Sequence, residues 1–240
     1  MAMAAGSRSE RISEKVLVDS VVAAAFATNC WILSGRGSGQ ALLVDPGIGD
    51  PYLHDALLER CSELGLRPVA TLLTHGHLDH IFSLAPLCQA EKIPAYIHPS
   101  DRGLLTNPER ALTRSAQAMI PPGMRFTEPD EVFALDDGLT LEIAGMRMRF
   151  AHTPGHTPGS IVATIEEEYL LSGDVLFAGS IGRTDLPLGS LRDMEVSLRE
   201  KIIPLPDELE VLPGHGKRTT IGAERRNNPF LRAAMEGRLA

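Results

Sequence analysis

The stretch Thr74-His75-Gly76-His77-Leu78-Asp79-His80 carries the most information in this sequence. Three of the eight histidines and one aspartate fall within its last six residues. Imidazole and carboxylate groups are ligands that suit divalent zinc, iron or manganese. The alternative is a loop of solvated histidines, but the crowding of four such side chains into one loop favours a metal site.

The spacing indicates how these side chains are presented. A helical metal site places two histidines four residues apart on one face. His75 and His77 are two residues apart, so an extended or loop backbone points them the same way. Asp79 and His80 are adjacent, and we expect them to diverge. One short loop would then serve two metal ions.

Composition sets modest bounds on the function. The chain has 240 residues, of which 43% are hydrophobic, as is typical of a globular protein with a substantial core. The formal net charge is −8, and runs of lysine and arginine do not go beyond short pairs. A nucleic-acid-binding surface would show a basic stripe, so we expect no nucleic-acid partner. Small anionic substrates are compatible with this charge, because a metal ion supplies positive charge of its own.

The cysteines and the N-terminal sequence indicate a cellular compartment. Cys30, Cys61 and Cys88 are odd in number and lack C-x-x-C spacing, which predicts buried, reduced thiols and no sulfur-rich metal site. Residues 1–15 lack the apolar core of a signal peptide, and we expect them to form a disordered leader before a single domain over residues 16–240. No apolar run approaches 18 residues, so no membrane span is expected. These features predict a cytoplasmic protein; they leave its oligomeric state open.

The hydrophobic pattern predicts a layered α/β fold. Short apolar runs that end in turn signals are typical of strands covered on both faces, and they occur at residues 41–44, 69–73, 160–165, 169–172 and 211–212. Alternating residues predict a hairpin from 139–143 and 146–150. Three- and four-residue spacing predicts helices over residues 51–64, 81–88 and 191–203. The proline-containing segment 107–130 is expected to be a mobile excursion.

The remaining polar motifs follow the predicted strands. Asp45, residues 75–80, residues 152–156, Asp174 and His215 each come where a strand ends, which is where ligands collect in open α/β sheets. A single Gly-His or Gly-Asp turn is more often structural than functional. Together, and in this order, the motifs point to one site.

The series T-H-x-H-x-D-H, G-H-T-x-G, G-D and G-H resembles the metallo-β-lactamase superfamily. The stretches G-R-T-D-L-P at 182–187 and I-G-A-E-R-R-N-N-P-F-L at 221–231 resemble the small bacterial glyoxalase II-like hydrolases, of the hydroxyacylglutathione hydrolase type. The resemblance implies an αββα sandwich, in which two β-sheets are flanked by helices and the metal site lies along one edge.

The resemblance also implies a ligand set. His75, His77 and His156 would hold a first divalent ion; Asp79, His80 and His215 would hold a second; and Asp174 would bridge them. Zinc is the foremost expectation, with iron or manganese as alternatives. Asp79 and Asp174 would act in catalysis together with a metal-bridging water. Two divalent ions, two carboxylates and a hydroxide leave a net charge of about +1, which suits a polarised carbonyl and the oxyanion formed on attack.

Four further residues are expected to lie next to the ligands without binding metal themselves. Asp45 is a candidate acceptor that orients the histidine loop, although a solvated turn aspartate is a close alternative. Arg183 and Asp185 are expected to form an ion pair near the site. His152 is expected to be a packed imidazole near the site, and not an eighth ligand.

Two features depart from the family pattern. Many members carry two glycines after the last histidine of the first loop, where this chain has Ile81-Phe82-Ser83, so we expect a narrower pocket. Full-length glyoxalase II enzymes add a helical C-terminal domain that helps bind glutathione. Only 25 residues follow His215, so we expect that domain to be missing and the thiol carrier to be open.

The leading hypothesis is therefore a metal-dependent hydrolase of thioesters such as S-lactoylglutathione. The nearest alternative is a persulfide dioxygenase with a single iron, a relative that shares G-R-T-D. Metal content and oxygen consumption would separate the two. A third hypothesis is a metal-holding module without turnover, which the complete ligand set disfavours.

Overall fold

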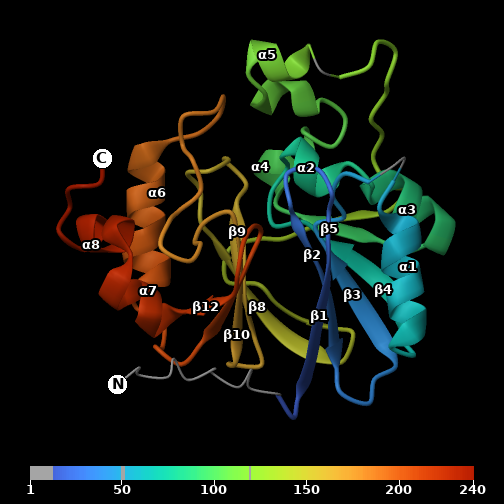
Figure 1. Cartoon of the computed structure of the whole chain (residues 1–240), viewed down its shortest axis with the longest axis horizontal. Helices are drawn as coiled ribbons and strands as arrows, with labels where there is room; N and C mark the ends of the chain where they lie inside the picture. Colours follow the sequence, from blue (N-terminus) through green and yellow to red (C-terminus); the bar gives the residue numbers. More distant parts are fainter. Residues whose placement is uncertain (1–12, 50–51, 119) are drawn as a thin grey trace, which may run out of the picture.

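The computed structural model describes residues 13–49, 52–118 and 120–240 and contains two six-stranded β-sheets packed face to face (Figure 1). The first sheet has the order β1-β2-β3-β4-β5-β6, antiparallel from β1 to β3 and parallel from β3 to β6. Its strands are β1 (Val16–Val22), β2 (Asn29–Gly35), β3 (Gln40–Val44), β4 (Arg67–Leu72), β5 (Ala95–Ile97) and β6 (Val132–Ala134).

The second sheet has the order β12-β11-β10-β9-β8-β7. Only β10 and β11 are parallel neighbours in it; the other pairs are antiparallel. Its strands are β7 (Thr140–Ile143), β8 (Met146–His152), β9 (Ile161–Ile165), β10 (Tyr169–Gly173), β11 (Glu210–Pro213) and β12 (Thr219–Thr220).

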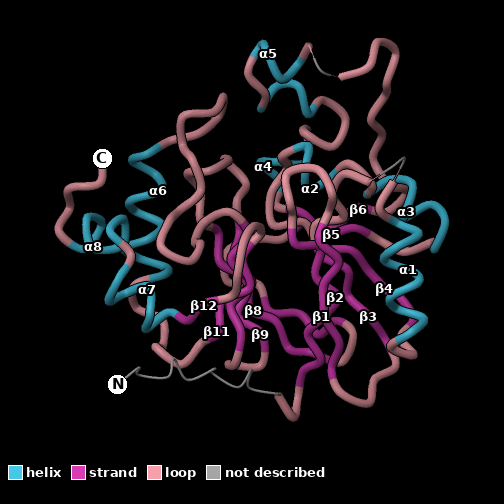
Figure 2. The backbone as a smooth tube through the Cα atoms, in the orientation of Figure 1, coloured by secondary structure: helices cyan, strands magenta, loops and turns pink. Residues whose placement is uncertain are grey.

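Helices cover the outer faces of both sheets (Figures 1 and 2). The first sheet carries α1 (His54–Glu63) and α3 (Leu84–Glu91), and the second carries α6 (Leu191–Ser197), α7 (Ile221–Asn227) and α8 (Pro229–Met235). A π-helical turn, Leu198–Ile202, extends α6. The short helices α2 (Leu78–Ile81), α4 (Pro99–Arg102) and α5 (Arg114–Gln117) and the 3₁₀ turn Pro108–Ala111 lie toward one end of the sandwich.

Alternation along the strands explains the layers. On β3, Leu42 and Val44 belong to the core between the sheets, whereas Ala41 and Leu43 pack with α1. Successive strand residues point to opposite faces, so a strand covered on both faces must be apolar throughout. All four of these residues are fully buried. The predicted αββα sandwich is therefore confirmed.

Several details differ from the sequence prediction. The helix predicted over residues 81–88 is two helices, α2 and α3, and the first begins at Leu78, inside the histidine motif. Of the predicted leader, residues 1–12 lie outside the described residues. Ser13 is buried, and its Oγ accepts hydrogen bonds from the backbone of Lys15 and Val16. No helix among the described residues is long and apolar enough to cross a membrane.

The strand directions bring the polar motifs together. In the first sheet β3, β4 and β5 run parallel, and in the second β8, β10 and β11 run in one direction. The carboxyl ends of these strands meet at one edge of the sandwich, near α2 and α4 (Figure 1). Loops at that edge carry all the predicted metal ligands.

Candidate metal centre

Seven side chains converge at this edge, and we call them the metal cluster. They are the residues that the sequence predicted as ligands: His75, His77, Asp79, His80, His156, Asp174 and His215. Two follow β4, two lie on α2, and one each follows β8, β10 and β11. The cluster thus draws on both sheets and on residues 140 positions apart in the sequence (75 to 215).

The cluster divides into overlapping groups of three. Ligand atoms lie within 4.8 Å of one another in the set His75/His77/His156 and in the set Asp79/His80/His215; a third set, His75/His80/Asp174, connects them. One oxygen of Asp174, Oδ2, lies 3.5 Å from His156 Nε2 and 3.4 Å from His215 Nε2. This carboxylate therefore stands between the two outer sets.

One local expectation was wrong. Asp79 and His80 were expected to diverge, yet Asp79 Oδ2 lies 3.6 Å from His80 Nε2 and 3.3 Å from His215 Nε2. Both residues lie on the single helical turn α2, for which His77 is the N-cap residue. The loop still contributes to two groups of ligands, because the change from extended to helical backbone comes after His77 and separates the first two histidines from the last two side chains.

Outer hydrogen bonds fix the orientation of four imidazoles. His156 Nδ1 lies 2.7 Å from the carbonyl oxygen of Arg183, and His215 Nδ1 lies 3.0 Å from that of Phe26. A carbonyl only accepts, so each Nδ1 donates and each Nε2 presents a lone pair to the cluster. His80 Nδ1 likewise meets a carboxylate oxygen of Asp45 at 3.0 Å.

His75 is oriented through a relay. Thr74 Oγ1 donates to Asp45 Oδ2 at 2.7 Å and therefore accepts from His75 Nδ1 at 3.0 Å. The backbone nitrogen of Thr74 also donates to Asp45 Oδ1. Asp45, 1% exposed, thus holds His80 directly and His75 through Thr74. The structure places this aspartate where the sequence hypothesis put it, behind the histidine loop.

The inner atoms fit a cation. Nε2 of His80 and Nε2 of His215 lie 3.2 Å apart, and both are lone-pair acceptors once their Nδ1 atoms donate outward. His75 Nε2 and Asp174 Oδ1 are buried without a hydrogen-bond partner among the described residues. Acceptors that converge without donors are unfavourable unless positive charge lies between them. The donor set of imidazole and carboxylate suits divalent metal ions.

The pKa values of the histidines also indicate that positive charge is favoured in the cluster. Burial lowers the pKa of His75 well below its usual value and that of His77 to about 3, so both imidazoles are neutral. Burial acts in the same direction on His80 and His215, but the carboxylates of the cluster outweigh it. The pKa values of these two histidines rise to about 9 and about 10. Positive charge is stabilised at their inner nitrogens.

The other predicted residues lie near the cluster in different ways. Arg183 contributes its backbone carbonyl to His156, while its exposed side chain pairs with Asp185 at 2.8 Å. His152 Nε2 lies 2.7 Å from the carbonyl of Pro158, and its ring stacks on His98 at 3.9 Å. Both arrangements match the predicted ion pair and packed imidazole.

Two glycines let the backbone approach Asp174. A methyl group on Gly214 would overlap Oδ1 of the Asp174 carboxylate, and one on Gly182 would overlap its backbone carbonyl oxygen. Only glycine leaves room at these positions. The Gly-His and Gly-Arg pairs of the sequence are therefore required by close packing around the shared carboxylate.

Sequence reasoning missed Asp101 and Phe26. Asp101 follows β5 and is fully buried, with hydrogen bonds to two of the ligand loops. Phe26 holds His215 through its backbone carbonyl, and its φ of 61° places it in the left-handed region. An Asp after His-Pro-Ser resembles an ordinary helix start, and a backbone contact has no side-chain signature. Neither residue therefore stood out.

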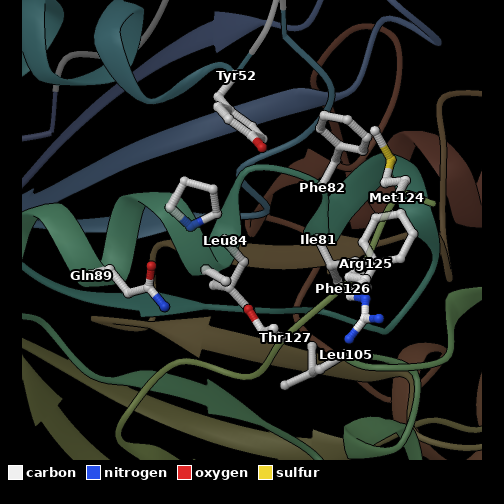
Figure 3. Close-up of a pocket in the computed structure, with 12 residues that line it drawn as sticks. Tyr52, Ile81, Phe82, Leu84, Gln89, Leu105, Met124, Arg125, Phe126 and Thr127 are labelled. Carbon is white, nitrogen blue, oxygen red and sulfur yellow. The ribbon is translucent and has the colours of Figure 1, made fainter. Parts of the chain in front are cut away.

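A pocket of about 210 Å³, lined by both apolar and polar side chains, lies beside α2, between α3 and segment 107–130 (Figure 3); we call it the Phe82 pocket. The ring of Phe82 lies 5.9 Å from that of Tyr52 and 6.2 Å from that of Phe126, and Met124 adds a thioether. The ring of Phe82, the residue that directly follows α2, forms one wall of this pocket. The next residue, Ser83, donates to the carbonyl of Gly47 at 2.6 Å.

The sequence model of the metallo-β-lactamase superfamily matches residues 23–215. The chain belongs to the metallo-β-lactamase superfamily. It is a hydrolase of this superfamily with a divalent-metal site at the edge of its sandwich.

Its relatives match over most of their length. An uncharacterized Mycobacterium tuberculosis protein is 42% identical over 90% of this chain and 98% of its own length. Hydroxyacylglutathione hydrolase GloC of Haemophilus influenzae is 36% identical over 89% of this chain and 97% of its own.

Two solved structures share 36% identity with this chain. The BLEG-1 B3 metallo-β-lactamase has a TM-score of 0.76, covering 90% of this chain and 99% of its own. TTHA1623, in a di-iron-bound form, has a TM-score of 0.73, covering 89% and 100%. Both similarities agree on the fold; the first protein is named for an activity, as a β-lactamase, and the second for a bound pair of iron ions.

Proposed function

We propose that this chain is a glyoxalase II-like thioester hydrolase with two metal ions, which converts S-lactoylglutathione or a related acyl-thiol and water to a carboxylate and a free thiol. The observation that carries the proposal is the position of Asp174. Its carboxylate lies 3.5 Å from one outer set of ligands and 3.4 Å from the other. A single carboxylate between two three-residue sets is the arrangement that a pair of ions requires.

The residues would divide the work of holding the ions. His75, His77 and His156 would bind the first, Asp79, His80 and His215 the second, and Asp174 both. Bound there, divalent ions would supply Lewis acidity, which lowers the pKa of a shared water and polarises the substrate carbonyl. Zinc suits this mixture of imidazole and carboxylate, and iron or manganese would also fit.

The protein's own groups set the conditions for that chemistry. Asp45 and the carbonyls of Arg183 and Phe26 hold three imidazoles in fixed orientations, so little reorganisation is needed when charge develops. Asp79 and Asp174 balance part of the metal charge and leave the centre positive toward an oxyanion. His215, with 25% of its side chain exposed, marks the side from which substrate can enter.

The three cysteines are poor candidates for a catalytic nucleophile. Cys30, Cys61 and Cys88 are all free and buried. Burial raises their pKa values to about 12, 11 and 11, so none forms a thiolate readily. Water activated at the metal cluster is therefore the nucleophile that we propose.

The thioester specificity is supported by two similarities. GloC, named as a hydroxyacylglutathione hydrolase, aligns with nearly the whole chain at 36% identity. The Gly182-Arg183-Thr184-Asp185 stretch, which resembles the glyoxalase II-like group, contributes the carbonyl that orients His156. BLEG-1 is equally similar in sequence, so β-lactam hydrolysis is a rival that must be measured.

The test is a substrate panel on one metal-analysed preparation. We expect about two metal equivalents per chain and the highest kcat/KM on lactoyl thioesters, measured alongside a lactone, a β-lactam and glutathione persulfide with oxygen monitoring. An Asp174→Ala variant serves as the control for contaminating hydrolases. Rapid β-lactam or lactone opening without thioester turnover would overturn the substrate assignment. A single iron with oxygen consumption would establish the dioxygenase instead.

A further inference from the structure

Asp101 is a buried carboxylate that joins two of the ligand loops. It lies on α4, just past β5, and its side chain is fully buried. Its Oδ2 accepts from the backbone nitrogen of Gly76 at 2.8 Å and from Thr157 Oγ1 at 2.6 Å. Its Oδ1 accepts from the backbone nitrogen of Gly159 at 2.7 Å. No lysine, arginine or histidine pairs with it within the described part of the chain.

The partners of Asp101 fall on one half of the metal cluster. Gly76 lies between His75 and His77, and Thr157 directly follows His156. These three histidines form one outer ligand set. The first two follow β4 of one sheet and the third follows β8 of the other, so Asp101 spans the gap between the sheets. The three hydrogen bonds of Asp101 do not involve Asp79, His80 or His215, the residues of the other outer set.

The two ligand loops pack closely against Asp101 and its neighbour Leu104, so the position of this segment fixes the separation of the loops. A methyl group on Gly159 would lie 2.6 Å from Cγ of Asp101, and one on Gly76 would lie 2.8 Å from the side chain of Leu104. Neither position tolerates a side chain without movement, so glycine allows the two loops to pack closely against α4 and against Leu104, which follows it. A small displacement of Asp101 would therefore change the separation of the loops.

We propose that Asp101 is a positioning residue that sets the spacing between His75, His77 and His156 and thereby controls affinity for the first metal ion alone. The inference rests on the proposed two-ion centre but is independent of the substrate. Asp45 plays the corresponding part for His80 on the other side, although it also reaches His75 through Thr74.

A carboxylate suits this role better than an amide. Its two oxygens accept from both loops at once, and hydrogen bonds to an ionised acceptor are short and strong. An asparagine offers one acceptor oxygen and one NH₂ group. Whichever way it is turned, its NH₂ would face a backbone N–H of Gly76 or Gly159. The substitution thus removes one connection without removing volume.

The experiment compares Asp101→Asn with Asp55→Asn, a control on α1 whose side chain is 87% exposed. Cobalt(II) is titrated into metal-free full-length protein in the presence of a competing chelator, and both dissociation constants are measured. We expect the Asp101 variant to bind one ion as the unaltered protein does and the other about 10- to 100-fold more weakly, as when outer partners of metal ligands are lost.

Two reference variants identify the ion that is lost. The cobalt spectrum of singly loaded Asp101→Asn should match that of His77→Ala and differ from that of His215→Ala. Thr157→Val, which removes one of the three hydrogen bonds, should weaken the same ion by a smaller factor. Combined with Asp101→Asn, it should be less than additive, because both act through one network.

The outcomes separate this inference from the proposed function. Equal weakening of both ions, or a spectrum matching His215→Ala, would show a general structural role and overturn the inference. Unchanged affinities in the Asp101 variant would also overturn it. Unaltered protein that binds only one ion would contradict the two-metal proposal itself. Thioester turnover does not enter this test, so an incorrect substrate leaves the result intact.

Discussion

The ligand loops and segment 107–130 lie at the same end of the molecule but are built in opposite ways (Figure 1). Every imidazole of the cluster except that of His215 is at least 96% buried, and outer hydrogen bonds tie the loops to other elements. The described residues of segment 107–130 are mostly exposed, and their hydrogen bonds are largely local. An exposed ion pair between Glu128 and Arg102 connects this segment to α4.

The difference separates two requirements of an enzyme. Chemistry at a metal pair needs atoms fixed to within a fraction of an ångström, which buried and cross-linked loops provide. Selection among substrates needs surfaces that vary without disturbing the ligands, and exposed loops on a rigid scaffold provide those. Changes in the ligand loops should therefore remove metal, whereas changes around the Phe82 pocket should alter KM with metal content unchanged.

The largest effect is expected from Asp174→Ala. Loss of the carboxylate between both ligand sets should remove metal and activity together, by more than the roughly 100-fold that follows loss of an outer partner. Elemental analysis and kcat on the same sample measure both. His54→Ala is the matched control, because His54 lies on α1 and contacts Asp55. Comparable metal loss in the His54 variant would contradict the assignment of the metal site to the cluster.

A single methyl group provides the next test. Gly214→Ala should crowd the Asp174 carboxylate, reduce metal content and lower the free energy of unfolding by about 1–3 kcal/mol. Gly103→Ala is the control, because a methyl there meets nothing closer than 3.5 Å, at the end of the Arg110 side chain. Chelator titration and denaturant unfolding measure the two effects. Identical behaviour of both variants would show that the packing around Asp174 is not limiting.

A change in the Phe82 pocket should give a smaller effect of a different kind. Phe82→Ala removes one wall, and for a thioester with a bulky apolar group we expect KM to rise about 10-fold, as for a lost apolar contact. Metal content and kcat for small substrates should stay the same. Phe133→Ala, on β6 and 47% exposed, is the control. Lost metal in the Phe82 variant would mean that pocket and cluster are not separable.

The smallest effect is expected at Arg183. Its backbone carbonyl holds His156, but its guanidinium only pairs with exposed Asp185. Surface ion pairs contribute little, so Arg183→Ala should keep both metal ions and its thermal midpoint. Isothermal titration with metal measures the number of bound ions, and a thermal melting curve measures the midpoint. Weakened binding of the first ion would show that the side chain, and not the carbonyl alone, orients the ligand.

Prediction from the sequence succeeded where the pattern of apolar residues depends on local backbone geometry. The continuous apolar run at 41–44 indicated a strand covered on both faces, and β3 is such a strand. It failed at the divergence of Asp79 and His80, because a helical turn begins at Leu78, where the carbonyl of His77 accepts from the backbone nitrogens of His80 and Ile81. The π-helical turn after α6 was also invisible, since its apolar spacing resembles that of an α-helix.

The sequence by itself determined the chemistry of this protein: imidazoles and carboxylates at the ends of apolar strands, in numbers that suit divalent metal ions. Side-chain identity fixes ligand preference, and that information is local. Tertiary structure alone decided the distances: Asp174 between two ligand sets, Asp45 behind one and Asp101 joining the other. Those distances depend on how two twisted sheets pack and which strand ends share an edge, which is a property of the whole core.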